Sequence, residues 1–254
     1  MHFCGLLLLS LLCQTPEPEL RTASSHPMKY HLSLPKGWDK QKTWPVVVVI
    51  PDAGRDFAGN LAAFIKARQD RPYILVAPHV VTSGGRNYRM ADSYRYSGED
   101  WKRVAADGDG RFDEEGVAAM IADVKRVFRG EDRSYLTGWE AGGHTVWALT
   151  FRRPEWFSAA APVTTNFQGR WLDEASFSRS PARGKLPIRV LFCEKKSAPQ
   201  GWDFCMSQTK NALKAAEEHG FRKPDFKVIP GKPHGPLAED VLGYFDAVRA
   251  GRSP

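Results

Sequence analysis

The hydrophobic pattern after residue 28 alternates between the spacing of a strand and the spacing of a helix. Val46 to Ile50 is a continuous β-branched run, which is typical of a strand buried on both faces. Other strand-like patterns occupy residues 30–34, 73–77, 134–137, 157–162, 188–192 and 226–229. Helical spacing marks residues 61–65, 117–128, 141–151, 212–216 and 237–248. This alternation predicts an α/β fold with a mostly parallel central sheet covered by helices on both faces.

Length and charge narrow the possibilities further. The chain has 254 residues, 42% of them hydrophobic, which suits one large domain, and we expect that domain over residues 28–250. The formal net charge is +7, but basic and acidic residues are mixed along the whole length, so nucleic-acid binding is not expected. No Cys or His spacing is typical of a zinc site, and we expect no metal and no cofactor. The pattern does not indicate an oligomeric state.

The N-terminal residues 1–27 differ from the rest. Residues 3–13 (FCGLLLLSLLC) are almost all apolar, too short to span a bilayer as a helix but suited to the apolar centre of a signal peptide. No Lys or Arg precedes this segment, so a disordered leader is the alternative. Cys13 is a candidate for lipid attachment, although Leu12 is larger than the residue such a site prefers. We expect a secreted or periplasmic protein that contacts a membrane only if Cys13 carries a lipid.

Two further features leave alternatives open. Cys193 and Cys205 could form a disulfide in an oxidising compartment, or could remain buried thiols. Residues 82–112 have no sustained period and predict a long surface loop. The aromatic residues of this loop either stack on a sugar or an aromatic acyl group, or hold the loop against the core; they are Tyr88, Tyr94, Tyr96 and Trp101.

A glycine-flanked turn between a strand and a helix carries the main chemical signal. The sequence from Tyr135 to His144 reads YLTGWEAGGH, which matches the strand–turn–helix setting of G-x-S-x-G except for the serine. Gly138 and Gly142 allow the tight turn, and the central residue is Glu140. In this setting the central side chain is presented at the N-terminus of the helix.

With this turn, the chain resembles the secreted polyhydroxybutyrate depolymerase, feruloyl esterase and acetylxylan esterase group of α/β-hydrolases. The resemblance covers residues 30–245 and includes the segments YHLSLPKGWDKQKTWPVVVVI, FRGEDRSYLTGWEAGGH, EWFSAAAPVT and PGKPHG. It implies the α/β-hydrolase fold and an ester-type ligand, either a small molecule or a fragment of a polysaccharide or polyester.

The resemblance also implies three catalytic positions. A serine is expected at residue 140, where this chain has Glu140, and the histidine falls at His234, after the last strand. The acid position aligns with Lys196, and Glu194 or Asp203 could replace it only if the loop takes an unusual path. The segment Pro51-Asp52-Ala53-Gly54 stands where such families usually show His-Gly. Backbone amides could still form an oxyanion hole, with Ala53 or Gly54 on one side and Ala141 on the other.

A glutamate at the nucleophile position permits two kinds of function. Its carboxylate is ionised at an ordinary pKa of about 4.3 and could attack an sp³ carbon, after which water activated at His234 would release the product. Alternatively, the carboxylate is stabilised by the helix N-terminus, accepts the oxyanion amides and pairs with protonated His234. With Lys196 at the acid position, two members of the triad change charge type.

The favoured hypothesis is therefore an exported hydrolase-fold protein that is catalytically impaired, or that binds its ligand without turnover. The alternative is an active hydrolase on carboxylic esters or related electrophiles, using Glu140 and His234. Lys196 is the third residue of this candidate site.

Overall fold

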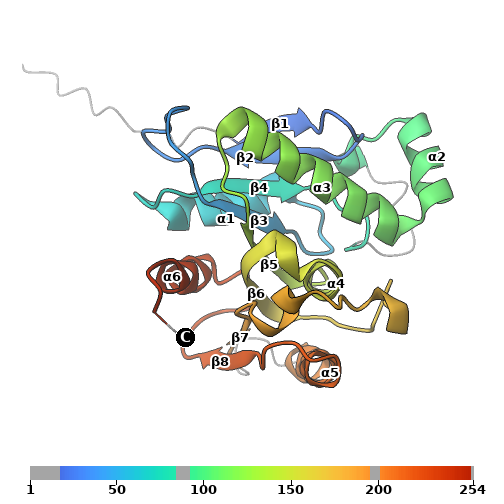
Figure 1. Ribbon diagram of the computed structural model, residues 1–254, viewed down its shortest axis with the longest axis vertical. Coiled ribbons are helices and arrows are strands. Elements are labelled where there is room, and N and C mark those ends of the chain that lie inside the picture. The colour runs from blue at the N-terminus through green and yellow to red at the C-terminus, as the bar shows by residue number, and fades with distance from the viewer. Residues whose placement is uncertain (1–17, 84–91, 195–200, 253–254) are drawn as a thin grey trace, which may run out of the picture.

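The computed structural model describes residues 18–83, 92–194 and 201–252, and an eight-stranded sheet lies at its centre (Figure 1). The strand order is β1-β2-β4-β3-β5-β6-β7-β8. The strands are β1 (Glu19–Thr22), β2 (Lys29–Ser33), β3 (Val46–Ile50), β4 (Ile74–Pro78), β5 (Ser134–Glu140), β6 (Phe157–Thr165), β7 (Arg189–Cys193) and β8 (Asp225–Ile229). β2 runs antiparallel to β1 and β4, whereas the pairs from β4 to β8 are parallel.

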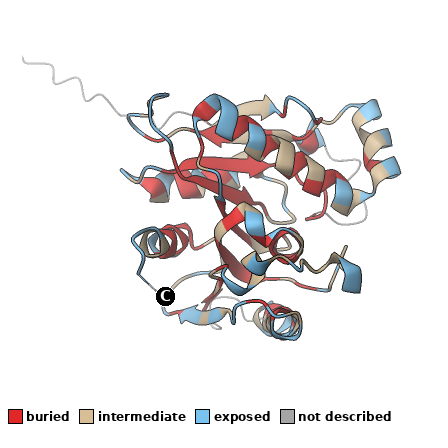
Figure 2. Ribbon diagram, viewed as in Figure 1, coloured by how far each residue is buried: buried red, intermediate tan, exposed pale blue. Residues whose placement is uncertain are grey.

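Helices cover both faces of the sheet, as predicted. One face carries α1 (Phe57–Arg68) and α6 (Ala238–Arg249), and the other carries α3 (Asp109–Phe128), α4 (Gly143–Arg152) and α5 (Trp202–Glu218) (Figure 1). Each face encloses its own apolar cluster, and the side chains of β3 alternate between the two clusters. This explains the unbroken valine run, because neither face of β3 meets water (Figure 2). Short 3-10 helices occupy Asp92–Tyr94, Pro154–Trp156, Glu174–Ser176 and Pro181–Gly184.

The loop predicted over residues 82–112 is wrong for much of its length. Helix α2 (Gly98–Asp107) begins with a reciprocal capping pair between Ser97 and Asp100, and α3 already begins at Asp109. The helical period was hidden because Val104 is the only buried residue of α2. Gly108, with a φ of 78°, makes the sharp change of direction between the two helices.

The aromatic residues of this segment hold it against the core. Tyr94 is fully buried and its ring meets the edge of Trp101, at 5.4 Å between centroids. The hydroxyl of Tyr96 donates to the carbonyl of His79 at 2.8 Å. These contacts favour the packing interpretation over sugar stacking for the three residues. Tyr88 lies outside the described residues.

The predicted domain boundary at residue 28 lies too far along the chain. β1 already forms the edge of the sheet, and beyond it Ser24 donates its backbone N–H and hydroxyl to Asp123 of α3, each at 2.6 Å. Four residues with the sequence ELRT give no readable period, so the strand could not be recognised by its pattern. Within the described residues, none of the helices is long and apolar enough to cross a membrane. Cys13 lies outside those residues.

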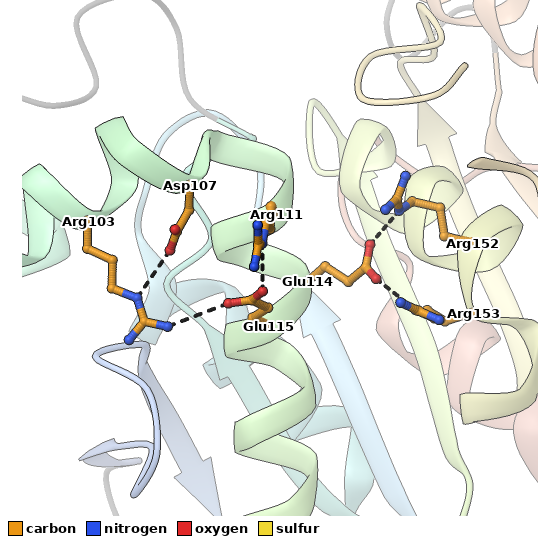
Figure 3. A network of polar contacts seen from close by, with 7 residues as sticks. All are labelled: Arg103, Asp107, Arg111, Glu114, Glu115, Arg152 and Arg153. Carbon is orange, nitrogen blue, oxygen red and sulfur yellow. Dashed lines mark hydrogen bonds and ion pairs between the residues drawn. The ribbon is translucent and has the colours of Figure 1, made fainter. Parts of the chain in front are cut away.

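A charged network joins α3 to α4, the helix that follows the glycine-flanked turn (Figure 3). Glu114 of α3 is buried and its two carboxylate oxygens bind Arg152 and Arg153 at the end of α4. Its neighbour Glu115 is more exposed and pairs with Arg111 at 2.7 Å and Arg103 at 3.5 Å. The buried half of this network ties α4 in place.

Candidate functional site

The turn from β5 into α4 has the tight geometry that its glycines predict. Glu140 adopts a left-handed φ of 49°, which a residue with a side chain adopts only at a cost in strain. A Cβ atom on Gly142 would lie 2.4 Å from the carbonyl oxygen of Pro51, and one on Gly143 would lie 2.3 Å from the Cβ of Thr165. The turn is thus pressed between the loop after β3 and the end of β6, and Glu140 is its central residue.

The Glu140 side chain is half-buried and faces a second carboxylate. Its pKa is raised above the ordinary value, first by burial and then by the negative charge of Asp52, while the nearby His234 acts in the opposite direction. Among the residues that the structure describes, none donates a hydrogen bond to the Glu140 carboxylate. The expected bonds from the oxyanion amides, and the expected direct pairing with His234, are therefore not formed.

Asp52, rather than Glu140, accepts a hydrogen bond from one of the candidate oxyanion amides. The Gly54 N–H donates to Asp52 Oδ1 at 3.2 Å, and the Asn60 side chain donates to the same oxygen at 3.3 Å. Asn60 in turn accepts the indole N–H of Trp139 at 2.6 Å. Within the described ranges, the amides of Ala53 and Ala141 donate no hydrogen bond. Two of the three predicted amides thus remain open, beside a carboxylate.

His234 lies on the loop between β8 and α6, as predicted. Its Nδ1 atom is 3.7 Å from the Sγ of Cys193, the last residue of β7, and its ring meets that of Trp139 edge-on at 5.2 Å. In the described part of the chain no carboxylate contacts the His234 ring. Glu194 points elsewhere in this loop cluster, since its carboxylate accepts the backbone N–H of Gly231 at 3.0 Å. Lys196 lies outside the described residues.

Asp52 and Cys193 were not assigned to the site from the sequence. Asp52 could have been found from its place in the segment where the resembling family has His-Gly. Cys193 could have been found only with the register of β7, because a strand's side chains alternate between its two faces.

The two cysteines are free thiols, which agrees with one of the two alternatives from the sequence. Both are buried, and the thiol of Cys205 donates to Asn166 Oδ1 at 3.2 Å. The pKa of Cys205 is raised to about 11, mainly by burial and further by the charges of Glu140 and Cys193. Since the thiolate is the reactive form, Cys205 is a poor nucleophile in this state.

A cavity of about 490 Å³ lies beside His234, between α1 and the start of α6. Lys66 and Gln69 line it on one side and Lys232 on the other, whereas Glu140 is not among its lining residues. In the described residues there is no group of three or more His, Cys, Asp or Glu side chains placed to hold a metal ion.

No protein-family model matches the sequence, and no curated protein matches it in a sequence search. Many solved structures are similar in three dimensions. The poly(3-hydroxybutyrate) depolymerase LpqC from Bordetella parapertussis has a TM-score of 0.58 at 17% identity, over 90% of this chain and 86% of that one. The poly(aspartic acid) hydrolase-1 from Sphingomonas sp. KT-1 has a TM-score of 0.60 at 16% identity, over 89% and 96%.

A thermostable esterase has a TM-score of 0.58 at 16% identity over 92% of this chain, which spans only 62% of that protein. The similar structures are esterases and hydrolases, and the mostly parallel eight-stranded sheet of this chain agrees with their fold. The chain therefore has the α/β-hydrolase fold. At these identities the likeness defines the fold and does not extend to an activity.

Proposed function

We propose that this protein descends from the serine esterases, does not turn over carboxylic esters, and uses the site around Glu140 and His234 to bind a ligand. The observation that carries the proposal is the pair of carboxylates, Asp52 and Glu140, at the two places where ester hydrolysis needs hydrogen-bond donors and a hydroxyl. Each carboxylate belongs to an element that the fold holds rigidly, β3 with its loop and the turn after β5.

Electrostatics explain why this pair opposes ester hydrolysis. The tetrahedral intermediate carries a negative charge on oxygen, and removal of a single oxyanion donor costs about 10²- to 10³-fold in kcat. Here the Gly54 amide already binds Asp52, and the same charge raises the pKa of Glu140. A developing oxyanion would meet two carboxylates instead of several donors.

A second function is favoured by the absence of hydrogen bonds to Glu140 among the described residues. A free carboxylate could displace a leaving group from an sp³ carbon, forming an alkyl ester with Glu140 and breaking the carbon–oxygen or carbon–halogen bond. Water deprotonated at His234 would then cleave that ester. His234 has no described carboxylate to stabilise its protonated form, so the second step is the slow one.

The two functions are separated by an activity panel with short nitrophenyl esters, an epoxide and a haloalkane on wild type and Glu140→Gln. Our proposal predicts no turnover of any of these by wild type above buffer. Ester turnover that survives in wild type and disappears in Glu140→Gln would overturn it. An alkylated Glu140 detected by peptide mass spectrometry after incubation with the epoxide would establish the second function.

We further propose an ester-type ligand, either a small molecule or a fragment of a polysaccharide or polyester, and export from the cytoplasm. The open amides of Ala53 and Ala141 support a ligand with an accepting oxygen. Fractionation of the producing cells tests the export, since recovery of the full-length chain in the cytoplasm alone would contradict it. A lipid on Cys13 would be visible as added mass on the N-terminal peptide.

A further inference from the structure

The hydrogen-bonding groups around His234 are exchanged relative to those that the resemblance implies. In the implied triad a hydroxyl donates to one ring nitrogen and the other nitrogen donates to a carboxylate. In this chain the thiol of Cys193 lies at Nδ1, and the carboxylate of Glu140 lies within electrostatic range of the ring. The hydrogen-bond donor and the carboxylate near His234 have therefore been exchanged relative to the implied triad.

The thiol of Cys193 has one hydrogen-bonding contact among the described residues, although the Cys205 thiol lies within electrostatic range. The side chain is fully buried at the end of β7, and among the described residues the Sγ contacts only His234 Nδ1 as a hydrogen-bonding group. The Cys193 backbone is bound separately, since its N–H donates to the Thr164 hydroxyl at 3.2 Å and its carbonyl accepts the Trp202 indole N–H at 2.9 Å. Both bonds fix the place of the thiol relative to the histidine.

The two neutral forms of His234 differ in what they offer to these neighbours. If Nδ1 carries the proton, it donates to sulfur, a weak acceptor, and the strongly accepting lone pair stays on Nε2, in a site that already contains the Glu140 carboxylate. If Nε2 carries the proton, Nδ1 accepts from the thiol, and Nε2 offers an N–H donor to this negatively charged site. The second form is favoured, because an imidazole nitrogen accepts better than sulfur does and a thiol can donate.

We propose that Cys193 is the positioning residue of His234 and that it holds the histidine with the proton on Nε2. The histidine then offers a hydrogen-bond donor at Nε2, where a triad would offer a base. This inference deepens the proposed function and rests on it: the ligand group bound at His234 is an acceptor, such as the carbonyl oxygen of an ester, which is held and not attacked.

Vibrational spectroscopy of the thiol tests the contact directly. The S–H stretching band of Cys193 is assigned by its loss in Cys193→Ser, and we expect it at the lower wavenumber of a donating thiol. In His234→Phe, which keeps a flat ring but removes the acceptor, the band should move to higher wavenumber. The band of Cys205, which donates to Asn166, should stay in place and is the matched control.

Nitrogen NMR on protein with labelled histidines shows which ring nitrogen of His234 carries the proton. We expect the His234 signals of the Nε2–H form in wild type and in Cys193→Ser, which keeps a donor. Cys193→Asp should convert them to the Nδ1–H form, since a carboxylate reaches one bond further than the thiol and only accepts. Cys205→Asp, with the same change at the other buried cysteine, should leave the His234 signals in the Nε2–H form.

Either of two results would overturn the inference. One is an Nδ1–H signal for His234 in wild type, and the other is an S–H band of Cys193 that does not respond to His234→Phe. Neither measurement needs Cys193→Asp to fold, and neither depends on turnover. Ester hydrolysis by wild type would instead refute the proposed function, so the two failures are distinguishable.

Discussion

Glu140 combines a strained backbone with an unfavourable electrostatic position. Its left-handed conformation costs roughly 1–2 kcal/mol for a residue with a Cβ atom. Its carboxylate is half-buried and faces Asp52 without a hydrogen bond from the described residues. The turn keeps this conformation because Gly142 and Gly143 leave no room for the backbone to relax against Pro51 and Thr165.

Replacement of this carboxylate should stabilise the protein in a pH-dependent way. The raised pKa means that the folded state disfavours ionisation, so stability is lost as the pH rises through the pKa of the folded state. Glu140→Gln should match wild type near pH 3.5 and exceed it at pH 8, by on the order of 0.5 kcal/mol after allowance for solvent screening. Urea unfolding at both pH values measures this difference.

Exposed Glu155 provides the control for this experiment, because Glu155→Gln should leave the unfolding curves unchanged at both pH values. A Glu140→Gln variant that loses stability at pH 8 would show that the carboxylate has a favourable partner in solution.

The sequence pattern identified the turn and its central residue but not the partners of His234. A G-x-x-x-G turn between strand and helix is a local pattern, so Glu140 could be placed without the fold. The contact of Cys193 depends on which residue ends β7 and on which side its thiol points. A shift of one residue would bring Glu194 to the histidine instead, and hydrophobicity does not distinguish these registers.

The helices and strands of this protein differ in how clearly the hydrophobic pattern of the sequence predicts them. β3 and the second half of α3 have clear apolar patterns and could be predicted, whereas α2 has a capped start and one buried valine. The position of α4 also depends on charges that no periodicity reveals. Glu114 links α3 to α4 through Arg152 and Arg153, residues that are about 40 positions away in the chain.

The ion pairs of buried Glu114 should contribute more to the free energy of unfolding than the ion pairs of the more exposed Glu115. Glu114→Ala leaves two arginines beside a buried surface, and we expect a loss of about 1–3 kcal/mol in the free energy of unfolding. Glu115→Ala removes exposed pairs with Arg103 and Arg111 and should cost less than about 1 kcal/mol. Denaturant titrations of the two variants compare the costs, and equal losses would contradict a special role for the buried half of the network (Figure 3).

For the whole molecule, buried Asp113 of α3 should give stability a distinctive pH dependence. It accepts the backbone N–H groups of Val81 and Thr82 at 2.9 and 2.8 Å, yet burial raises its pKa to about 7. Between its unfolded pKa near 4 and this value the folded state holds one proton more than the unfolded state. Stability from this group is thus complete below about pH 4 and falls as the pH rises towards 7.

Asp113→Asn removes this titration, so the stability of the variant relative to wild type should rise by roughly 1–3 kcal/mol between pH 4.5 and 7.5. Asp113→Asn also alters hydrogen bonds, but this contribution to stability is the same at every pH. It therefore cancels when only the change of the stability difference with pH is compared. Guanidinium unfolding across this range provides the measurement. Parallel curves for the two proteins would mean that Asp113 titrates near its ordinary pKa.

The order of strands and helices was predictable at this scale because the core of an α/β sheet leaves continuous apolar segments in the chain. The N-terminal limit of the sheet was not, since β1 contributes backbone pairing rather than buried side chains. Ala23 and His26, which precede the predicted boundary, are buried, so the domain begins before residue 28.

If the chain is exported as we propose, this edge strand restricts where a signal peptidase can cut it. A signal peptidase acting after residue 27 would remove β1 together with the Ser24 bonds to Asp123, and would leave β2 with an unpaired row of backbone donors and acceptors. Such a row is a template on which another chain can add as a strand. Cleavage before Glu19 would keep β1 paired over β2 and the Ser24 bonds in place, so we expect a cut after residue 27 to make the mature protein more prone to aggregation than a cut before Glu19.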